Sequence, residues 1–149
     1  MNCQPIGFVK SPVKDGMDSS WGAIESELHI EDQFGAGLTG VNSFSHIMVI
    51  FEMHRSSWDP ATDLVRRPQG RSDMPLIGIF AQRAKHRPNP IGVTSVRLLG
   101  VEGNVIKVRG LDAIDGSPIL DVRPYFAKYD MVAGSHAPEW VERLMSGYF

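Results

Sequence analysis

The sequence has 149 residues, of which 42% are hydrophobic, and this suits one domain with a sizeable core. No stretch approaches the roughly 18 uninterrupted apolar residues that a membrane helix needs, and residues 1–11 lack the apolar run of a signal peptide. Cys3 is the only cysteine, which excludes an internal disulfide and leaves a zinc site without thiolate ligands. We therefore expect one cytoplasmic domain over residues 1–149, with no membrane segment and no metal.

The first half of the chain predicts short strands. Residues 6–9 open the chain, and residues 27–30 alternate polar and apolar as a half-buried strand does. Residues 47–51 are a continuous apolar run, which predicts a strand buried on both faces. Residues 35–40 match the GxGxxG dinucleotide pattern, but they lead into a strand and not into the helix that would meet a phosphate. We interpret these glycines as a flexible turn.

The second half adds four predicted strands, at residues 76–80, 94–99, 105–109 and 119–122. Gly103 and Asn104 are turn residues between two of them and predict a hairpin. Residues 58–74 contain Pro60, Pro68 and Gly70 without any period, which indicates a long loop. Many short strands with little helix predict an all-β fold, an antiparallel sheet or barrel.

One helix is predicted, close to the C-terminus. Pro138 suits its first position, and Gly147 suits its end. The spacing i, i+3, i+4 and i+7 gives it one apolar stripe, made of Val141, Leu144, Met145 and Tyr148.

The charge is unevenly distributed. Between residues 66 and 109 there are nine basic residues and two acidic ones, a net +7, which leaves −9 for the rest because the whole chain carries −2. Such a concentration favours an anionic partner. The alternative is that these charges scatter over a solvated surface.

The basic segment contains a loop stiffened by proline, residues 83–92. Pro88 and Pro90 fix their own backbone and push Arg87 and Asn89 into extended conformations. Asn89 then keeps its amide free for a ligand, and Arg83 and Arg87 can each grip a carboxylate or a phosphate. Gly92 permits a close backbone approach. The alternative is a rigid structural turn with solvated arginines.

Three further polar residues are candidates for chemistry. Asp112 and Asp115 flank a tight turn, where a carboxylate can cap the turn or accept two ribose hydroxyls. His54 lies just past the apolar run 47–51, beside Arg55, where a strand opens into a loop. His29 and His46 are better explained as hydrogen-bonded sheet positions.

Three motifs resemble the TsaA-like (TrmO, YaeB, VirR) family: FSHI at 44–47, RPNPIG at 87–92 preceded by FAQR, and LDAIDGSPILDVRPY at 111–125. The resemblance implies a single-sheeted β-barrel, and the residue patterns above add antiparallel strands, long loops and a short C-terminal helix to this expectation. It implies a homodimer that binds S-adenosylmethionine (SAM) and methylates N6 of threonylcarbamoyladenosine at tRNA position 37, in the anticodon loop. The chain departs from the family pattern at Trp21, which stands where many members have proline, and at the basic pair Lys85 and His86.

By the same resemblance, the SAM pocket is expected to contain Trp21, Gly22, His54, Arg55, Arg83, Asn89, Gly92, Val93, Leu111, Asp112, Asp115 and Gly116. Asn89 is expected to position the reactants, and either Asp115 or His54 could accept the departing proton, although water serves equally well. The RNA backbone is expected to contact Arg66, Arg67, Arg71, Lys85 and Arg87. Two other functions stay open: a SAM-binding regulator without catalysis, and a plain RNA-binding barrel.

Overall fold

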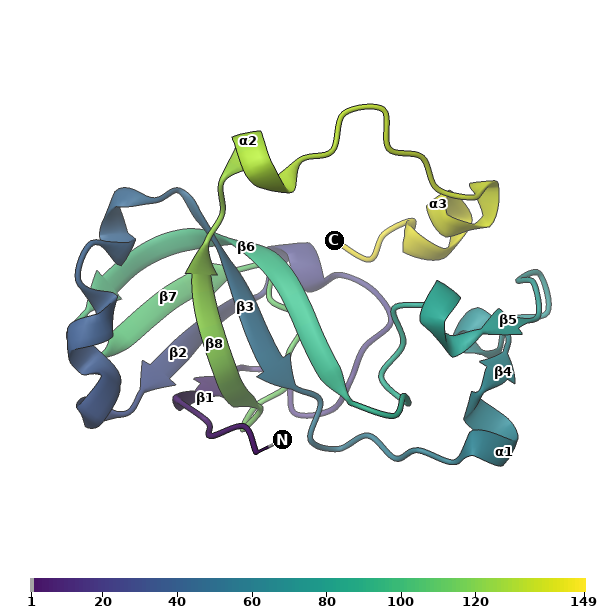
Figure 1. Cartoon of the computed structure of the whole chain (residues 1–149), viewed down its shortest axis with the longest axis horizontal. Helices are drawn as coiled ribbons and strands as arrows, with labels where there is room; N and C mark the ends of the chain where they lie inside the picture. Colours follow the sequence, from purple (N-terminus) through teal and green to yellow (C-terminus); the bar gives the residue numbers. More distant parts are fainter. Residues whose placement is uncertain (1) are drawn as a thin grey trace.

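A computed structural model describes residues 2–149 and contains a closed barrel of six strands (Figure 1). The strands are β1 (Gly7–Lys10), β2 (Glu25–Ile30), β3 (His46–Glu52), β6 (Ile91–Glu102), β7 (Val105–Arg109) and β8 (Pro118–Pro124). Their order around the barrel is β1-β2-β7-β6-β3-β8, and every neighbouring pair is antiparallel. The all-β antiparallel barrel expected from the sequence is confirmed.

The hydrophobic core fills the interior of the barrel. Alternate side chains point inward along each strand, so Leu28, Val49, Ile106 and Ile119 are completely buried. In β3 the outward residues Met48 and Ile50 are only partly covered. The prediction that residues 47–51 are buried on both faces is therefore wrong, because a sheet that closes on itself has a single interior.

The β6–β7 hairpin turns at Gly103 and Asn104, as predicted, with Gly103 at φ +58°. Strand β6 begins at Ile91 and not at residue 94. Gly92 and Val93 therefore belong to a strand, and they are not part of the preceding loop.

One end of the barrel is covered by two short 3-10 helices, η2 (Asp32–Leu38) and η3 (Val41–Ser43). Phe34 and Leu38 pack against the core from this side. A Cβ on Gly35 would lie 2.3 Å from the side-chain oxygen of Asn104 in the hairpin turn. Close packing thus requires a glycine at residue 35, whereas a Cβ on Gly37 or Gly40 would meet nothing within 4 Å. The flexibility predicted for residues 35–40 stays a prediction.

Between β3 and β6 the chain leaves the barrel in an excursion, residues 53–90. It contains α1 (Pro60–Asp63), β4 (Val65–Arg66), η4 (Pro68–Gly70), β5 (Ile77–Gly78) and η5 (Ile79–Ala81), with β4 and β5 paired as a separate two-stranded sheet. The predicted long loop at 58–74 therefore contains short elements.

The predicted strand at 76–80 is wrong beyond its first pair of residues. Only Ile77 and Gly78 pair as a strand, and the chain then turns to bury Ile79 while Leu76 and Phe80 stay 62% and 80% exposed. The buried Gln82 fixes this turn, because its amide donates to the carbonyls of Arg66 and Ile77 at 2.9 Å each.

After β8, residues 126–149 contain α2 (Ala127–Asp130) and α3 (Glu139–Met145), and α3 lies beside the excursion (Figure 1). The predicted C-terminal helix is confirmed, although Pro138 lies just before its first residue and not in the first helical position, and Gly147, at φ +75°, follows its end. Tyr148 lies beyond the helix and returns to the barrel. No helix within residues 2–149 has the length and apolarity to cross a membrane.

Candidate active site at one end of the barrel

The end of the barrel opposite η2 carries three connections: β1 to β2, β3 to β6, and β7 to β8. This follows from the antiparallel register, in which Lys10, Glu25, Glu52, Ile91, Arg109 and Pro118 are the strand residues nearest that end. Each residue that the sequence predicts for the cofactor pocket lies in one of these connections or at the adjoining strand end. The closed topology thus brings together positions that are up to 95 residues apart, from Trp21 to Gly116.

Asp112 lies at the centre of a hydrogen-bond chain at this end. The hydroxyl of Thr94, on β6, donates to Asp112 Oδ1, and the hydroxyl of Tyr148 donates to Asp112 Oδ2 at 2.8 Å. Burial raises the pKa of Tyr148 well above its ordinary value, with Asp112 adding to the rise and Arg83 opposing it. Arg83, Asp112 and Tyr148 therefore share one electrostatic environment.

The β1–β2 connection forms a second wall through η1 (Trp21–Ala23). Trp21 is buried, and its indole nitrogen donates to the carbonyl of Met17 at 3.0 Å. Gly22 lies so close to residue 149 that a Cβ there would be 2.5 Å from the carbonyl carbon of Phe149. In this structure the space beside Gly22 is therefore taken by the protein's own chain.

Asp115 is engaged by the protein itself. Its carboxylate accepts the backbone N–H of Ser11 at 2.9 Å and the ammonium of Lys14 at 2.5 Å. These two hydrogen bonds, that from Lys14 first, hold the pKa of Asp115 below its ordinary value. The carboxylate ties the first connection to the third, and this geometry disfavours the predicted role as proton acceptor.

His54 and Arg55 follow β3 at the start of the excursion. His54 Nδ1 is buried and has no hydrogen-bond partner among the described residues, and its Nε2 lies beside Gly116, which has φ +77°. A buried polar atom left unpaired is costly, so this nitrogen is available to pair with a ligand or a water molecule. Arg55 instead donates to the carbonyl of Lys14 at 3.1 Å and to Asp15 at 3.2 Å.

The loop that ends in the two prolines is anchored at both ends. Its Pro90 carbonyl accepts the N–H of Met53 at 2.7 Å, and Arg83 donates to the carbonyl of Val93 at 2.8 Å. Asn89 is exposed, and its side chain has no hydrogen bond to residues 2–149. The amide predicted to contact a ligand is thus free to do so.

Gly92 and Leu111 occupy structural positions. The ring of Phe51 covers Gly92, where a Cβ would lie 2.3 Å from the ring. Leu111 is completely buried in the core, so only its backbone can face the site. The close approach expected at Gly92 is real, but the approaching group is a side chain of the neighbouring strand.

Four of the five arginines and lysines predicted to contact RNA are bound to the protein. Arg66 pairs with Asp63 at 3.4 Å, Arg71 pairs with Asp73 at 2.7 Å, and Arg67 donates to the carbonyl of Met74. Arg87 turns back to the carbonyls of Gln82 and Ala84 at 3.0 and 3.4 Å. One terminal amine of Arg87 therefore stabilises its own loop, and the RNA contact expected of Arg87 stays a prediction.

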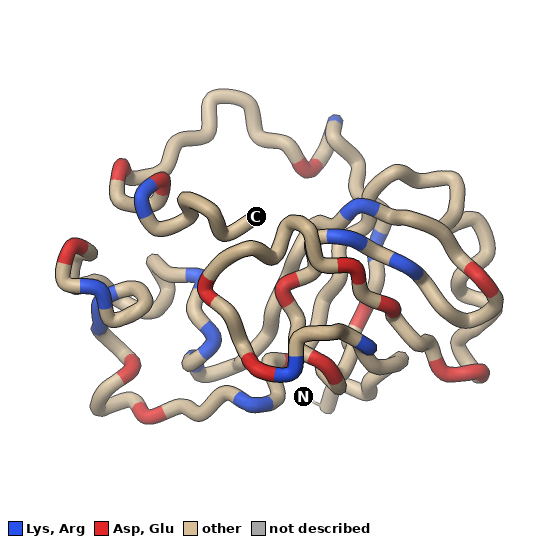
Figure 2. The backbone as a smooth tube through the Cα atoms, turned by 180° about the vertical axis from the view of Figure 1, so that it is seen from behind, with Lys and Arg blue, Asp and Glu red and all other residues tan. Residues whose placement is uncertain are grey.

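Lys85 is the exception in this set, since it is exposed and makes no ion pair within the described part of the chain. Figure 2 shows basic and acidic positions interspersed along the backbone. Arg66, Arg71, Lys107 and Arg109 are each paired with an acidic side chain, so the charge asymmetry of the sequence is neutralised only in part.

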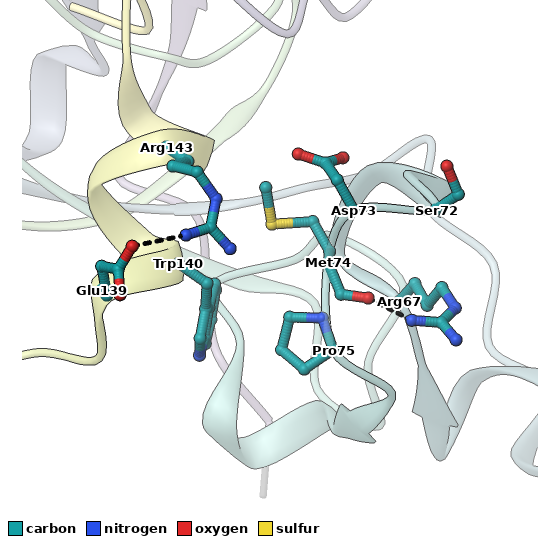
Figure 3. Close-up of a pocket in the computed structure, with 8 residues that line it drawn as sticks. All are labelled: Arg67, Ser72, Asp73, Met74, Pro75, Glu139, Trp140 and Arg143. Atoms are coloured by element: carbon teal, nitrogen blue, oxygen red, sulfur yellow. Dashed lines mark hydrogen bonds and ion pairs between the residues drawn. The ribbon is translucent and has the colours of Figure 1, made fainter.

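A separate hollow of about 420 Å³ lies between α3 and the excursion, away from Asp112. Trp140 and Arg143 of α3 face Met74 and Pro75 across it (Figure 3). Arg143 is paired with Glu139 at 3.0 Å. Within residues 2–149 no group of three His, Cys, Asp or Glu side chains is placed to hold a metal ion.

Sequence reasoning missed Thr94 and Tyr148. Thr94 had a usable signal, because it is a polar residue at an inward position of β6, between Gly92 and Val96. Tyr148 had none, since its spacing matches the apolar stripe of the helix. Its contact with Asp112 depends on how residues 126–149 return to the barrel.

Comparison with known proteins places this geometry in context. Residues 14–131 match the model of a family described as the tRNA-methyltransferase O N-terminal domain. An S-adenosyl-L-methionine-binding protein of Archaeoglobus fulgidus is 38% identical over 136 residues, which is 89% of this chain and 94% of that protein. A tRNA (adenine(37)-N6)-methyltransferase of Mus musculus is 34% identical over 136 residues, 85% of this chain but 31% of that protein.

The fold comparison agrees. The crystal structure of TrmO from Pseudomonas aeruginosa superposes with a TM-score of 0.74 and 28% sequence identity, covering 93% of this chain. The chain spans 62% of the length of that structure.

Proposed function

The chain belongs to the family of tRNA-methyltransferase O N-terminal domains, and from this we propose that it is a SAM-dependent tRNA methyltransferase. The observation that carries the proposal is that three connections meet at the barrel end opposite η2, where Asp112 is hydrogen-bonded by Thr94 and Tyr148. The opposite end is filled by Phe34 and Leu38. A smaller hollow of about 280 Å³ also lies at that opposite end, beside Gly37 and Phe44, but the residues predicted for the cofactor pocket all lie at the end with the three connections.

The residues at this end fit the chemistry of SAM. The Asp112 carboxylate keeps lone pairs that suit ribose hydroxyls. One N–H group of Arg83 donates to the Val93 carbonyl, and its other N–H groups remain available to bind a carboxylate. The unpaired Nδ1 of His54 offers a further polar contact. When bound, SAM supplies a methyl group on a sulfonium, which is already a good leaving group.

The task left to the protein is positioning. Pro88 and Pro90 stiffen the loop that presents Asn89, and the bond from Met53 to Pro90 fixes that loop to the end of β3. An amine nitrogen that has gained a methyl group loses its proton readily. His54 or water is the acceptor in this scheme, since Asp115 is engaged by Ser11 and Lys14.

We propose N6 of threonylcarbamoyladenosine at position 37 of tRNA as the methyl acceptor. The mouse relative is a tRNA (adenine(37)-N6)-methyltransferase by name, and the three sequence motifs support the same substrate. An anticodon loop is single-stranded, so its base can be splayed into a pocket between loops. Lys85, exposed beside this end, is suited to hold the RNA backbone.

The experiment is methyl transfer with purified protein, labelled SAM and tRNA that carries threonylcarbamoyladenosine, followed by nucleoside mass spectrometry. The proposal predicts the N6-methylated nucleoside, and tRNA with unmodified adenosine at position 37 serves as the control. Equal labelling of both tRNAs would contradict the proposed substrate, but it would still support the proposed methyltransferase activity.

A second candidate function is a SAM-binding regulator without catalysis. It is favoured by the Archaeoglobus fulgidus relative, which is named for SAM binding alone. Saturable SAM binding with no transfer to any tRNA would establish this alternative in place of the first.

We also propose that residues 1–149 act as one domain and that the protein is a cytoplasmic homodimer. Exposed apolar side chains along the outer face of β6, among them Ile91, Val93 and Leu99, support an interface. Light scattering coupled to gel filtration tests the dimer, and a monomer at micromolar concentration would contradict it.

A further inference from the structure

Residues 147–149 form a short segment that closes the candidate active site from the side of α3. The N–H groups of Ser20 and Trp21 donate to the carbonyls of Gly147 and Tyr148, each at 2.8 Å. The absence of a side chain at Gly22 lets Phe149 pass against the β1–β2 connection. The segment is therefore held by backbone contacts that do not depend on the Tyr148 hydroxyl.

The Tyr148 side chain reaches from this segment to the carboxylate that faces the site. Its hydroxyl donates to Asp112 Oδ2 at 2.8 Å, while Thr94 donates to the other oxygen. Both carboxylate oxygens of Asp112 therefore accept a hydrogen bond, one from the Thr94 hydroxyl on β6 and one from the Tyr148 hydroxyl. Tyr148 lies outside residues 14–131, the part of the chain that matches the family.

A carboxylate has about four lone-pair sites, so two protein hydroxyls leave room for two more donors. The two hydrogen bonds fix the orientation of the carboxylate and therefore of its remaining lone pairs. Burial raises the pKa of Tyr148, so its hydroxyl stays protonated and remains a donor throughout the neutral range. A pair of adjacent hydroxyls on a sugar would then meet an acceptor that is already oriented.

We propose that Tyr148 is a positioning residue for the cofactor: it holds the Asp112 carboxylate so that its remaining lone pairs accept the ribose hydroxyls of SAM. The proposal rests on the function proposed above. It assigns to residues 147–149 the role of a wall of the pocket.

The test is Tyr148→Phe, which removes the hydroxyl and keeps the ring. Tyr129→Phe is the matched control, because Tyr129 is 77% exposed and its hydroxyl makes no hydrogen bond to the described residues. Titration calorimetry should show SAM binding about five- to tenfold weaker for Tyr148→Phe, the loss expected for a half-exposed hydrogen bond to a charged group. Tyr129→Phe should bind as the parent protein does. Equal affinity of Tyr148→Phe and the parent would overturn the proposal.

A ligand change separates positioning from mere structural support. S-adenosylhomocysteine and its 2′-deoxy analogue should be compared on the parent protein and on Tyr148→Phe. If Tyr148 acts through the carboxylate on the ribose, the penalty of the substitution shrinks for the deoxy ligand. A penalty that is the same for both ligands would show that the Tyr148 hydroxyl only supports the fold and does not act on the ribose, and it would reject the proposal.

One more variant separates the role of Tyr148 from the existence of the pocket. Asp112→Ala should abolish measurable SAM binding. If Asp112→Ala no longer binds SAM while Tyr148→Phe binds it with full affinity, the proposed role of Tyr148 is wrong and the proposed pocket at Asp112 is supported. If the parent protein itself does not bind SAM, the proposed function fails first.

Discussion

The ring of Phe51 lies directly over Gly92 of the neighbouring strand, so closely that a Cβ at residue 92 would be 2.3 Å from the ring. The pair joins the end of β3 to the start of β6, the two strands from which the excursion leaves. Gly92 therefore serves packing at the base of the candidate site.

Gly92→Ala should destabilise the protein. The added methyl group must push the Phe51 ring out of place, which costs about 2 kcal/mol by analogy with overpacked cores. Urea denaturation measures the effect. Gly100→Ala is the matched control in the same strand, because a Cβ there meets nothing within 4 Å. Equal stability of the two variants would contradict the packing role.

Alanine substitutions of Arg87 and Lys85 should have different effects, the first on stability and the second on tRNA binding. Arg87→Ala removes hydrogen bonds to two loop carbonyls and should lower stability by about 1 kcal/mol. Lys85→Ala should leave stability unchanged and weaken tRNA binding, reducing the slope of log affinity against log salt by about 0.7 to 1. Fluorescence anisotropy over a salt series measures this, and an unchanged slope would exclude Lys85 from the RNA contact.

Asp115 should contribute stability that depends on pH. Its pKa is lowered in the folded state, chiefly by Lys14 and then by the Ser11 N–H. Its contribution is therefore complete above the ordinary value of 3.8 and is lost as the pH falls through the lower folded value. Asp115→Asn should lower the melting temperature at pH 7 and differ less from the parent near pH 2. Asp15→Asn, at a largely exposed carboxylate, is the control; a deficit independent of pH would contradict the linkage.

Asn89 should affect turnover more than RNA affinity. Its side chain is free in this structure and is presented by a stiff loop, so Asn89→Ala removes a positioning contact while the chain around it stays in place. Single-turnover methyl transfer and filter binding measure the two quantities separately. A parallel loss of both would mean that Asn89 belongs to the RNA contact.

Local pattern was sufficient for much of the fold. The hairpin at Gly103 and Asn104 and the helix after Pro138 follow from turn chemistry and periodicity, and both are present. The strand expected at 76–80 fails because Gln82 and the burial of Ile79 turn the chain, and these are tertiary effects that no local pattern carries.

The candidate site shows the same division. Asp112, His54 and Asn89 are recognisable because polar residues follow strands or lie between prolines. The engagement of Asp115 by Lys14 and of Arg87 by its own loop depends on three-dimensional neighbours. The link from Asp112 to Tyr148 joins residues 36 apart and needs the closed barrel to exist.

The central claim is that SAM binds at the barrel end where the three connections meet. Hydrogen exchange of the whole protein with and without SAM, followed by mass spectrometry, tests it most directly. The account predicts slower exchange in residues 20–24, 53–57, 83–93 and 110–117, with no change in residues 32–43 at the opposite end. Protection confined to residues 32–43 or to the hollow beneath α3 would contradict it.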